Sequence, residues 1–587
     1  MKKLGALIKK GYGSERFRWC FAIFAALALI AFAAATRTIT FYDNDDLNVA
    51  WALAGYRSGT PSFSHPFINC IMAIFVSGLY TVLPQMPWWL LVQLAAVLLG
   101  MAAVFASILK AGFRNGVPLA LVLALIVAIG AGLYFYGIVL VTFTLSSAVI
   151  GAGAAALVLA ADAGDSQKVQ RRYLTLAVVL LAGSLLVRNS SGIAAACFVG
   201  GALIYRAAEA AKNGEREVKK RTLRFLAAAA AVVIVLAGVN AIGRSVQNPD
   251  GFTAYDEARA SFMDYPHDSY GENPELYESV GWDGTLYSLV SSWFYMDERV
   301  TTDAFSAIVQ GSEFAQMGFG GRVSNGWSVL TTFLGKYPLA IYIGTIVGAS
   351  WLAALGLFLF NRKRALAFAA ASAFLLGACA LLFYLCYTGR INLRGWMSVC
   401  IPAASAIWLC GFALYRPAEQ PKEKPATRIV RGLIVALTAV VSLGLGYKVF
   451  RTVMSYESDD MLNCSQAVVS YVLDHPENVY IRDVYAANNV DALSVYPDEK
   501  PTNLIDWGGC DMNTAAREKQ LSVNGLNSTF ANDLFRLDNV YYIGDLNGDY
   551  VGKLVKYMTE DCGATGYTVV STIIDSIVVI QFTFEAD

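Results

Sequence analysis

Apolar residues run along this chain in long blocks, and short polar segments separate the blocks. Each block spans roughly 20 residues, the length of a helix that crosses the hydrocarbon core of a bilayer. The pattern predicts a polytopic α-helical membrane protein with about 11 transmembrane helices. The predicted spans are Trp19–Ala35, Trp88–Leu109, Val117–Tyr134, Phe143–Ala161, Tyr173–Val187, Gly192–Tyr205, Phe225–Ile242, Leu339–Phe360, Ala365–Tyr387, Trp396–Leu414 and Ile429–Tyr447.

A twelfth apolar run, Phe67–Leu83, decides the topology, because every later span reverses direction if this run crosses the membrane. Lys and Arg of short loops favour the cytoplasmic side. With the run outside the bilayer core, 26 of the 45 basic residues fall on the side of the N-terminus. We therefore predict an interfacial helix, which His65, Pro66 and Asn69 at its start also favour. A twelfth span is the alternative.

Acidic residues have the opposite distribution. Segments 247–335 and 452–587 hold 34 of the 45 acidic residues and carry a net charge of −24. We expect both outside the cell, the N-terminus in the cytoplasm as a retained signal anchor, and the protein in the plasma (inner) membrane. Charged residues make up 15% of the chain and cancel to zero, which argues against a soluble enzyme and against a nucleic-acid partner.

The chain divides into a transmembrane domain, 1–451, and an extracytoplasmic α/β domain, 452–587. The transmembrane domain includes a first outer loop, 37–87, and a large outer loop, 247–335. In the tail, strand and helix patterns alternate and two strands close around Asp575, as in a small α/β domain. No phosphate-binding glycine motif opens its helices, so we assign it no nucleotide chemistry.

The outer tail contains an odd number of cysteines, which fixes no disulfide framework. One bridge between Cys510 and Cys562 is an open alternative, with Cys464 left over.

An acidic cluster follows the first span in "FYDNDDLNVAWALAGYRSGTPSFSHPF". Asp43, Asp45 and Asp46 occupy a turn, and Asn44 or Asp45 could cap the short helix that follows. Crowded carboxylates at a helix start suit a general base, or a ligand set for a divalent cation such as Mg or Mn. A solvated helix cap is the alternative. The expected apolar face of the helix is Leu47, Ala50, Trp51 and Ala54, with Gly55 and Gly59 ending it.

Three arginines lie beside the membrane on the same predicted outer side: Arg188 in "LLVRNSSG", and Arg390 and Arg394 in "YTGRINLRGW". Arg188 could either extend its head to the interface and meet capping needs or pair with a lipid phosphate. Arg390 and Arg394, in a short outer loop, run against the positive-inside trend, which indicates an anionic partner. That partner is either the acidic outer loop or a phosphate group, which arginine binds through two parallel hydrogen bonds.

The order of these elements resembles the GT-C superfamily of membrane glycosyltransferases, whose members include protein O-mannosyltransferases and the lipid A aminoarabinose transferase. That family places an acidic pair after the first span, then a short helix, a His-Pro element and an interfacial helix. Asp45-Asp46, the helix to Gly55, His65-Pro66 and Phe67–Leu83 match that order here. The resemblance covers residues 15–200 in order and the later spans more loosely.

Two positions depart from the family pattern. The family often has His-Pro-Pro where this chain has His65-Pro66-Phe67, and commonly Lys where this chain has Arg188.

The resemblance implies transfer of a sugar from a polyprenyl-phosphate donor to a cell-envelope glycan, lipid or protein acceptor at the outer face, with inversion. It implies that Asp45 and Asp46 are catalytic, with Asp45 as the general base. It also implies that Arg188, Arg390 and Arg394 bind the donor phosphate. The residues that we assign to the acceptor or substrate are Asp43, His65, Tyr387, Arg259 and Tyr265.

Two other functions remain open at this stage. A transporter or flippase for a lipid-linked substrate would also use outer arginines, but it would need ionisable residues along a path through the spans. The predicted spans are nearly free of charge. A surface receptor that senses through the tail would need no acidic cluster beside membrane-facing arginines. The sequence favours the enzyme.

Overall fold

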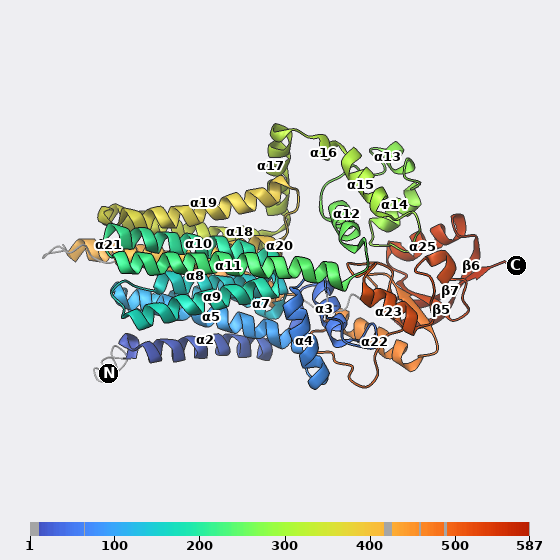
Figure 1. Ribbon diagram of the computed structural model, residues 1–587, viewed down its shortest axis with the longest axis horizontal. Coiled ribbons are helices and arrows are strands. Elements are labelled where there is room, and N and C mark those ends of the chain that lie inside the picture. Colours follow the sequence, from blue (N-terminus) through green and yellow to red (C-terminus); the bar gives the residue numbers. More distant parts are fainter. Residues whose placement is uncertain (1–10, 64, 416–424, 457–458, 487–489, 586–587) are drawn as a thin grey trace.

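The computed structural model describes residues 11–63, 65–415, 425–456, 459–486 and 490–585. A bundle of long apolar helices forms one half of the molecule, and polar helices and a sheet are gathered at one end of it (Figure 1). Seven of the basic residues that entered the topology prediction lie outside the described residues. They are Lys2, Lys3, Lys9, Lys10, Arg416, Lys422 and Lys424.

Eleven helices in the described part of the chain are long and apolar enough to cross a membrane, as the sequence predicted. The protein is therefore a multi-pass membrane protein. These spans are α2 (Glu15–Thr36), α5 (Trp88–Arg114), α6 (Leu119–Ile129) continued through a π-helical turn η1 (Gly130–Tyr134) into α7 (Phe135–Val139), α8 (Phe143–Ala160), α9 (Gln167–Val187), α10 (Asn189–Lys212), α11 (Arg216–Gln247), α18 (Pro338–Phe360), the short turn η2 (Arg362–Arg364) with α19 (Ala365–Tyr387), α20 (Leu393–Tyr415) and α21 (Pro425–Met454).

Helices α8 and α20 form the centre of the bundle: α8 is buried along its whole length and α20 from Trp396 to Tyr415. Small residues let neighbouring helices approach α8 closely, as is usual between helices in a membrane. A Cβ added to Gly100 of α5 would lie 2.4 Å from the carbonyl oxygen of Val149, and one added to Gly151 would lie 2.3 Å from the Cβ of Ala195. The helices at the periphery of the bundle instead leave apolar side chains exposed, such as Ile234 of α11 and Leu437 of α21, which suits contact with lipid.

The run Phe67–Leu83 forms α4 (Cys70–Val82), a 13-residue helix that is too short to span a bilayer. The side chain of Asn69 caps it by accepting from the amide of Ile71 at 3.1 Å, and its own amide donates to the carbonyl of Leu236 in α11 at 3.1 Å. The run is therefore not among the eleven spans, which argues against the alternative of a twelfth span, while its position in the interface stays a prediction. The helix lies at the end of the bundle that carries the sheet (Figure 1).

The large outer loop folds into short helices, of which the last, α17, runs across the direction of the spans (Figure 1). Its Phe319 and Trp327 are exposed. The loop helices are α12 (Phe252–Asp264), α13 (Pro274–Glu278), α14 (Gly284–Val290), α15 (Thr302–Gly311), α16 (Glu313–Gln316) and α17 (Phe319–Lys336).

The tail forms an α/β unit around a five-stranded sheet of order β4-β3-β5-β7-β6. Strand β3 is parallel to both of its neighbours, whereas β7 is antiparallel to β5 and β6. The predicted helix–strand alternation is confirmed, including the closing strands around Asp575, which adopts a left-handed turn (φ 48°). The elements are α22 (Asp459–Asp474), β3 (Val479–Arg482), β4 (Leu504–Asp506), α23 (Ala515–Val523), α24 (Ala531–Leu534), β5 (Val540–Asp545), α25 (Asp549–Glu560), β6 (Ala564–Ile574) and β7 (Ile577–Phe584).

The outer loop and the sheet share one hydrophobic core, so they form a single outer body. Phe294 of the loop packs edge-on against Trp507 beyond β4, with ring centroids 5.5 Å apart, and the amide of Tyr295 donates to the carbonyl of Trp507 at 3.1 Å. The disulfide alternative is wrong, because Cys510 and Cys562 are both free thiols, as are the other eight cysteines.

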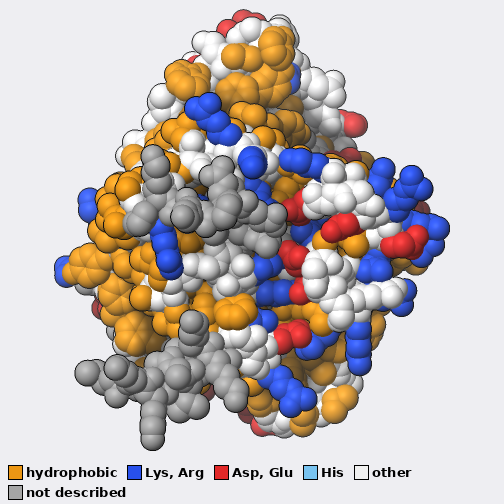
Figure 2. Space-filling view, turned by 90° about the vertical axis from the view of Figure 1, so that its left-hand side faces the viewer, with side chains coloured by type: hydrophobic (Ala, Val, Ile, Leu, Met, Phe, Trp, Pro, Cys, Tyr) orange, Lys and Arg blue, Asp and Glu red, His pale blue; other side chains and the backbone are white. Residues whose placement is uncertain are grey.

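The two ends of the bundle differ in charge. The acidic outer body covers one end, and the short loops at the other end carry Lys and Arg, which Figure 2 shows across that face with fewer Asp and Glu. Some of these basic residues are paired, for example Lys110 with Asp165 at 2.6 Å.

Candidate functional site

A two-stranded parallel ladder fixes the chain just before the acidic cluster. Strand β1 (Thr40–Phe41) follows the first span and pairs with β2 (Leu140–Val141), which precedes α8. The amide of Tyr42 continues the ladder by donating to the carbonyl of Val141 at 2.9 Å. The next residue, Asp43, is the N-cap of α3 (Asn44–Ala54) with an extended backbone. The N-cap is therefore Asp43, one residue before the earlier of the two predicted caps, Asn44 and Asp45. The ladder holds the chain extended up to Tyr42, and the helix begins two residues later.

Helix α3 matches the predicted amphipathic helix. Leu47, Ala50, Trp51 and Ala54 are all buried. Gly55 ends the helix in the left-handed conformation (φ 77°), and a Cβ there would lie 2.3 Å from the carbonyl carbon of Thr60. The tight turn after α3 therefore requires glycine at this position.

Arg394, in the first turn of α20, holds two of the three aspartates. Its guanidinium lies 2.7 Å from Asp43 and 3.1 Å from Asp45. The side chains of both aspartates keep about a quarter of their surface, 24% and 26%, exposed. Burial raises the pKa of Asp43 well above its usual value, and the neighbouring Asp45 acts in the same direction against Arg394.

Asp46 points the other way, into the protein, and is fully buried. Its Oδ1 accepts from the side chain of Gln93 at 2.8 Å, from the backbone amide of Phe143 at 3.1 Å and from the indole of Trp89 at 3.3 Å. Burial raises the pKa of this carboxyl to about 7 despite these three donors. Asp46 thus ties α3 to α5 and to the start of α8.

Arg188, at the junction of α9 and α10, is the cation with the fewest partners at this site. Its Nε donates to Ser190 at 3.0 Å, and its guanidinium lies over the ring of Phe143 at 4.5 Å. Its buried Nη1 has no hydrogen-bond partner, and no carboxylate of the described residues lies within ion-pair distance of it. Burial lowers its pKa to about 10, with nearby Arg394 acting in the same direction, so Arg188 stays charged at neutral pH.

Arg390 is held by the acidic outer loop, one of the two partners expected from the sequence. It forms an ion pair with Asp264 at 2.5 Å, and its guanidinium lies over the ring of Tyr265 at 5.3 Å. Burial raises the pKa of Asp264, and Arg390 opposes that shift. The arginine remains 40% exposed on its side chain.

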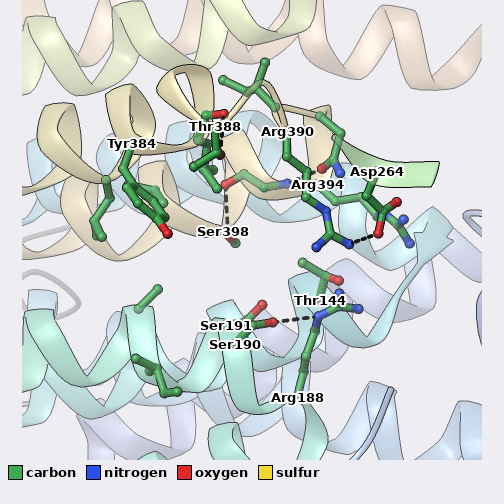
Figure 3. A pocket seen from close by; sticks show the side chains of 18 of the residues that line it. Thr144, Arg188, Ser190, Ser191, Asp264, Tyr384, Thr388, Arg390, Arg394 and Ser398 are labelled. Carbon is green, nitrogen blue, oxygen red and sulfur yellow. Dashed lines mark hydrogen bonds and ion pairs between the residues drawn. The ribbon is translucent and has the colours of Figure 1, made fainter. Parts of the chain in front are cut away.

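A cavity of about 530 Å³ brings the three arginines together. Arg188 projects from one wall, while Arg390 and Arg394 lie on the other (Figure 3). Asp264 and Tyr265 of the outer loop also line it, whereas Asp43 and Asp45 lie behind Arg394 and do not. Sequence reasoning missed several other polar lining residues, because they are isolated polar positions in or next to apolar helices: Thr144, Tyr384, Thr388 and Ser398.

An apolar groove continues from this cavity along the bundle. It has a volume of about 580 Å³, lies between α10 and α19, and shares Cys197 and Leu381 with the polar cavity. It reaches Ala208 on α10 and Leu366 on α19. At 1.5 Å per residue, Cys197 to Ala208 covers roughly 17 Å of helix, which is about half the depth of the hydrocarbon core.

His65 lies on the far side of α3 from the arginines, in a small space beside Arg57 and Asp511. Its ring is buried, its Nδ1 accepts from the amide of Phe67 at 3.3 Å, and its Nε2 has no partner. Burial lowers the pKa of this imidazole to about 4, so the ring is neutral at physiological pH.

Arg57, in the turn after α3, links the acidic cluster to the C-terminal unit. This buried guanidinium lies 2.7 Å from Asp506 and 2.7 Å from Asp511, and it also donates to Asn48 of α3. Asp506 is further held by Arg482 at 2.7 Å, and Asp511 by Arg517 at 3.3 Å. Sequence reasoning missed this clamp, because its residues are more than 400 positions apart.

Two predicted residues lie away from the cavity. Arg259 is buried in the outer body, where it pairs with Asp256 at 2.6 Å and stacks over Trp293. Tyr387 contacts the ring of Phe319 instead, one turn of α19 away from Tyr384, which does line the cavity.

The three aspartates do not converge on a common point, since Asp46 turns inward and Arg394 binds the other two. The described residues hold no group of three or more His, Cys, Asp or Glu side chains that could bind a metal ion. The predicted cation ligands Asp43, Asp45 and Asp46 therefore do not form a metal site in this arrangement.

Comparison with solved structures finds similar chains, among them two structures of ArnT from Cupriavidus metallidurans. The structure bound to undecaprenyl phosphate is 14% identical with a TM-score of 0.39, and covers 96% of this chain and 98% of that chain. The apo structure is 15% identical with a TM-score of 0.39, and covers 97% and 98%. No family model and no curated protein matches this sequence.

Proposed function

We propose that this protein is a glycosyltransferase that takes its sugar from a polyprenyl-phosphate donor at the outer face of the membrane. The observation that carries the proposal is Arg188, a largely buried cation without a carboxylate partner among the described residues. It lines a polar cavity that continues into an apolar groove at Cys197 and Leu381. A buried unpaired charge is costly, so the site favours an anion, and an arginine favours a phosphate.

The two cavities together fit an amphiphile whose head is anionic and whose tail is a long hydrocarbon. The head would lie among Arg188, Arg390 and Arg394, and the tail would follow the groove between α10 and α19 into the bilayer. A polyprenyl phosphate has that chemistry, and the remaining polar cavity volume would take the sugar.

Transfer would proceed by direct displacement. Asp45 would accept the proton of the acceptor hydroxyl while that oxygen forms a bond to the anomeric carbon. The bond from the anomeric carbon to the phosphate oxygen would break, its electron pair leaving with the polyprenyl phosphate, and the anomeric configuration would invert. The three guanidinium groups would stabilise the charge that develops on the leaving phosphate.

The remaining site residues would position these groups. Asp46 would fix α3 through its three donors rather than touch the substrate, since it is fully buried. Asp43 would share Arg394 with Asp45 and orient the acceptor. A donor phosphate would compete with Asp264 for Arg390, so Tyr265 and the end of α12 would move on binding.

The charges within the spans favour this function over transport. Among the described residues, the buried charged side chains of the spans lie near the helix ends, as Arg18, Lys110, Arg206 and Arg431 do. A flippase that moves a charged head through the bundle would need such groups along the path.

We also propose that the outer body faces away from the cytoplasm in the plasma membrane of a bacterium. The basic end of the bundle would then face inward, as Lys and Arg in short loops favour.

Binding of a polyprenyl phosphate to the purified protein tests this function. The Arg188→Gln substitution should weaken binding about 10- to 100-fold, since a hydrogen bond to a charged group contributes about 1.5–3 kcal/mol. The matched control is Arg451→Gln, an exposed arginine at the same end of the bundle that donates a hydrogen bond to Tyr447 and does not line the cavity; it should bind as the wild type does. Equal binding of the unphosphorylated polyprenol, or unchanged binding by Arg188→Gln, would contradict the proposal.

A further inference from the structure

A second basic cavity lies at the opposite end of the bundle, between the starts of α9 and α11. It has a volume of about 270 Å³ and is lined by four cations and one carboxylate, Glu217. Helix α9 has 21 residues and rises about 32 Å, so this cavity and Arg188 lie at opposite membrane faces. The lining cations are Arg171 on α9 and Lys220, Arg221 and Arg224 on α11.

Neutral amides, and not carboxylates, organise the cations of this cavity. Arg221 donates to Gln170, and Gln167 in the orientation that its neighbours favour accepts from Arg171 at 2.8 Å and from Arg221 at 3.2 Å. None of the four cations forms an ion pair with a carboxylate of the described residues. The cavity therefore keeps a formal charge of +3 at neutral pH with two guanidinium groups already oriented.

The cavity opens onto the lipid-facing surface of the bundle. Phe225 and the exposed Thr175 also line it. Along the same stripe of α9, Val179 lies two turns beyond Arg171 and is 57% exposed; along α11, Val235 lies three turns beyond Arg224 and is 58% exposed. An anionic group in the cavity could thus continue into acyl chains on this apolar surface.

Helix α11 also has the smallest buried fraction of the eleven spans in the described part of the chain. Only Thr222, Ala229 and Asn240 of its 32 residues are buried, yet it leads directly into the outer loop that carries Asp264 of the first cavity. A ligand that bridges α9 and α11 would brace this span.

We propose that the cavity between α9 and α11 binds the phosphodiester headgroup of an anionic membrane phospholipid. Basic cavities between spans on the cytoplasmic side suit such headgroups, and Arg171, Arg221 and Arg224 can each donate two parallel hydrogen bonds to a phosphate. The acyl chains lie on the exposed stripes of α9 and α11, and the bound lipid clamps α11 to the bundle.

Native mass spectrometry and thermal unfolding of the delipidated full chain in detergent test this site. Phosphatidylglycerol should bind as one tightly held molecule and raise the unfolding temperature, whereas phosphatidylcholine and inorganic phosphate should do neither. The triple variant Arg171→Gln, Lys220→Gln, Arg224→Gln should lose about a hundredfold in affinity, since each basic side chain contributes about fivefold. Arg224→Gln alone, which leaves the other cations in place, should lose about fivefold.

The matched control removes three charges from the same face of the bundle at Arg362, Lys363 and Arg364, outside the cavity. It should bind phosphatidylglycerol within about twofold of the wild type, because only charges in the cavity contact the headgroup. Three results would overturn the proposal: equal losses in both triple variants, which would indicate a diffuse field; wild-type binding by the cavity variant; or the same stabilisation by inorganic phosphate, which would indicate a free-anion site.

Discussion

The buried clamp at Arg57 makes a quantitative prediction about how the C-terminal unit supports the acidic helix. The Arg57→Met substitution keeps the length of the side chain but removes the cation shared by Asp506 and Asp511. Removing one partner of a buried ion pair costs about 3–5 kcal/mol. Each carboxylate keeps a second arginine, Arg482 or Arg517, so the lower end, about 3 kcal/mol, applies.

Native-state hydrogen exchange measures this cost locally. At 1.36 kcal/mol for each factor of ten, the opening equilibrium of the contact should rise by about 100- to 200-fold. Faster exchange should appear in peptides that cover 504–511 and the turn at 55–62, and not in the central helix α8. Because Arg188 is untouched, donor binding should be kept while the rate of transfer falls.

The control is Lys519→Met, which removes a surface hydrogen bond of 2.6 Å to Thr60 across the same contact. Exposed interactions of this kind contribute at most about 1 kcal/mol. If Arg57→Met accelerates exchange no more than Lys519→Met does, the buried ion pairs do not hold the C-terminal unit to α3.

Three further predictions concern the same region. Asp46→Asn keeps an acceptor for its three donors, so it should fold, whereas Asp46→Ala should cost about 1–3 kcal/mol for each donor left unpaired. Because the folded pKa of Asp46 is raised to about 7, wild-type stability should fall as the pH rises from about 4 through 7, and that part of the fall should be missing in melting curves of Asp46→Asn. Although burial alone would raise them, the facing arginines lower the pKa values of Asp506 and Asp511. Stabilisation by the clamp should therefore be complete above the unfolded pKa of about 3.9 and be lost only below it. Hydrogen exchange at 504–511, corrected for intrinsic rates, should accordingly stay constant between pH 5 and 8. Gly55→Ala should lower the free energy of unfolding by more than about 1–2 kcal/mol, which is the cost of the left-handed backbone alone. Gly59→Ala has the same backbone conformation and open space around the added Cβ, so it should cost only that amount. Chemical denaturation would measure both.

Features written in local sequence could be predicted. The spans follow from runs of apolar residues, and the exclusion of α4 from the spans follows from counting charges in short loops. The end of α3 follows from Gly55, since only glycine readily takes the left-handed turn there. Much of the helix–strand order of the tail also follows from local patterns. The sequence reading missed β4, which has three residues and too little sequence to show a period, and it missed the short helices α23 and α24.

Features that depend on distant contacts could not be predicted. The sequence groups Asp43, Asp45 and Asp46 as one cluster, yet the start of α3 sends Asp46 towards Gln93 and leaves the other two facing Arg394. Likewise the sequence does not distinguish Tyr384 from Tyr387 as a cavity residue. The packing of α17 on α19 places Tyr387 against Phe319, and Tyr384 lines the cavity. The Arg57 clamp joins positions that no local pattern connects.

Sugar transfer from a panel of radiolabelled polyprenyl-phosphate sugars to cell-envelope acceptors, with and without EDTA, tests the central claim most directly. The wild type should move label from one donor to an acceptor. Asp45→Asn should bind that donor normally and lose about 10²- to 10⁴-fold in rate, the usual contribution of a general base. Transfer by Asp45→Asn at the wild-type rate would contradict the assigned chemistry, and movement of intact donor across vesicle membranes without transfer would contradict the function.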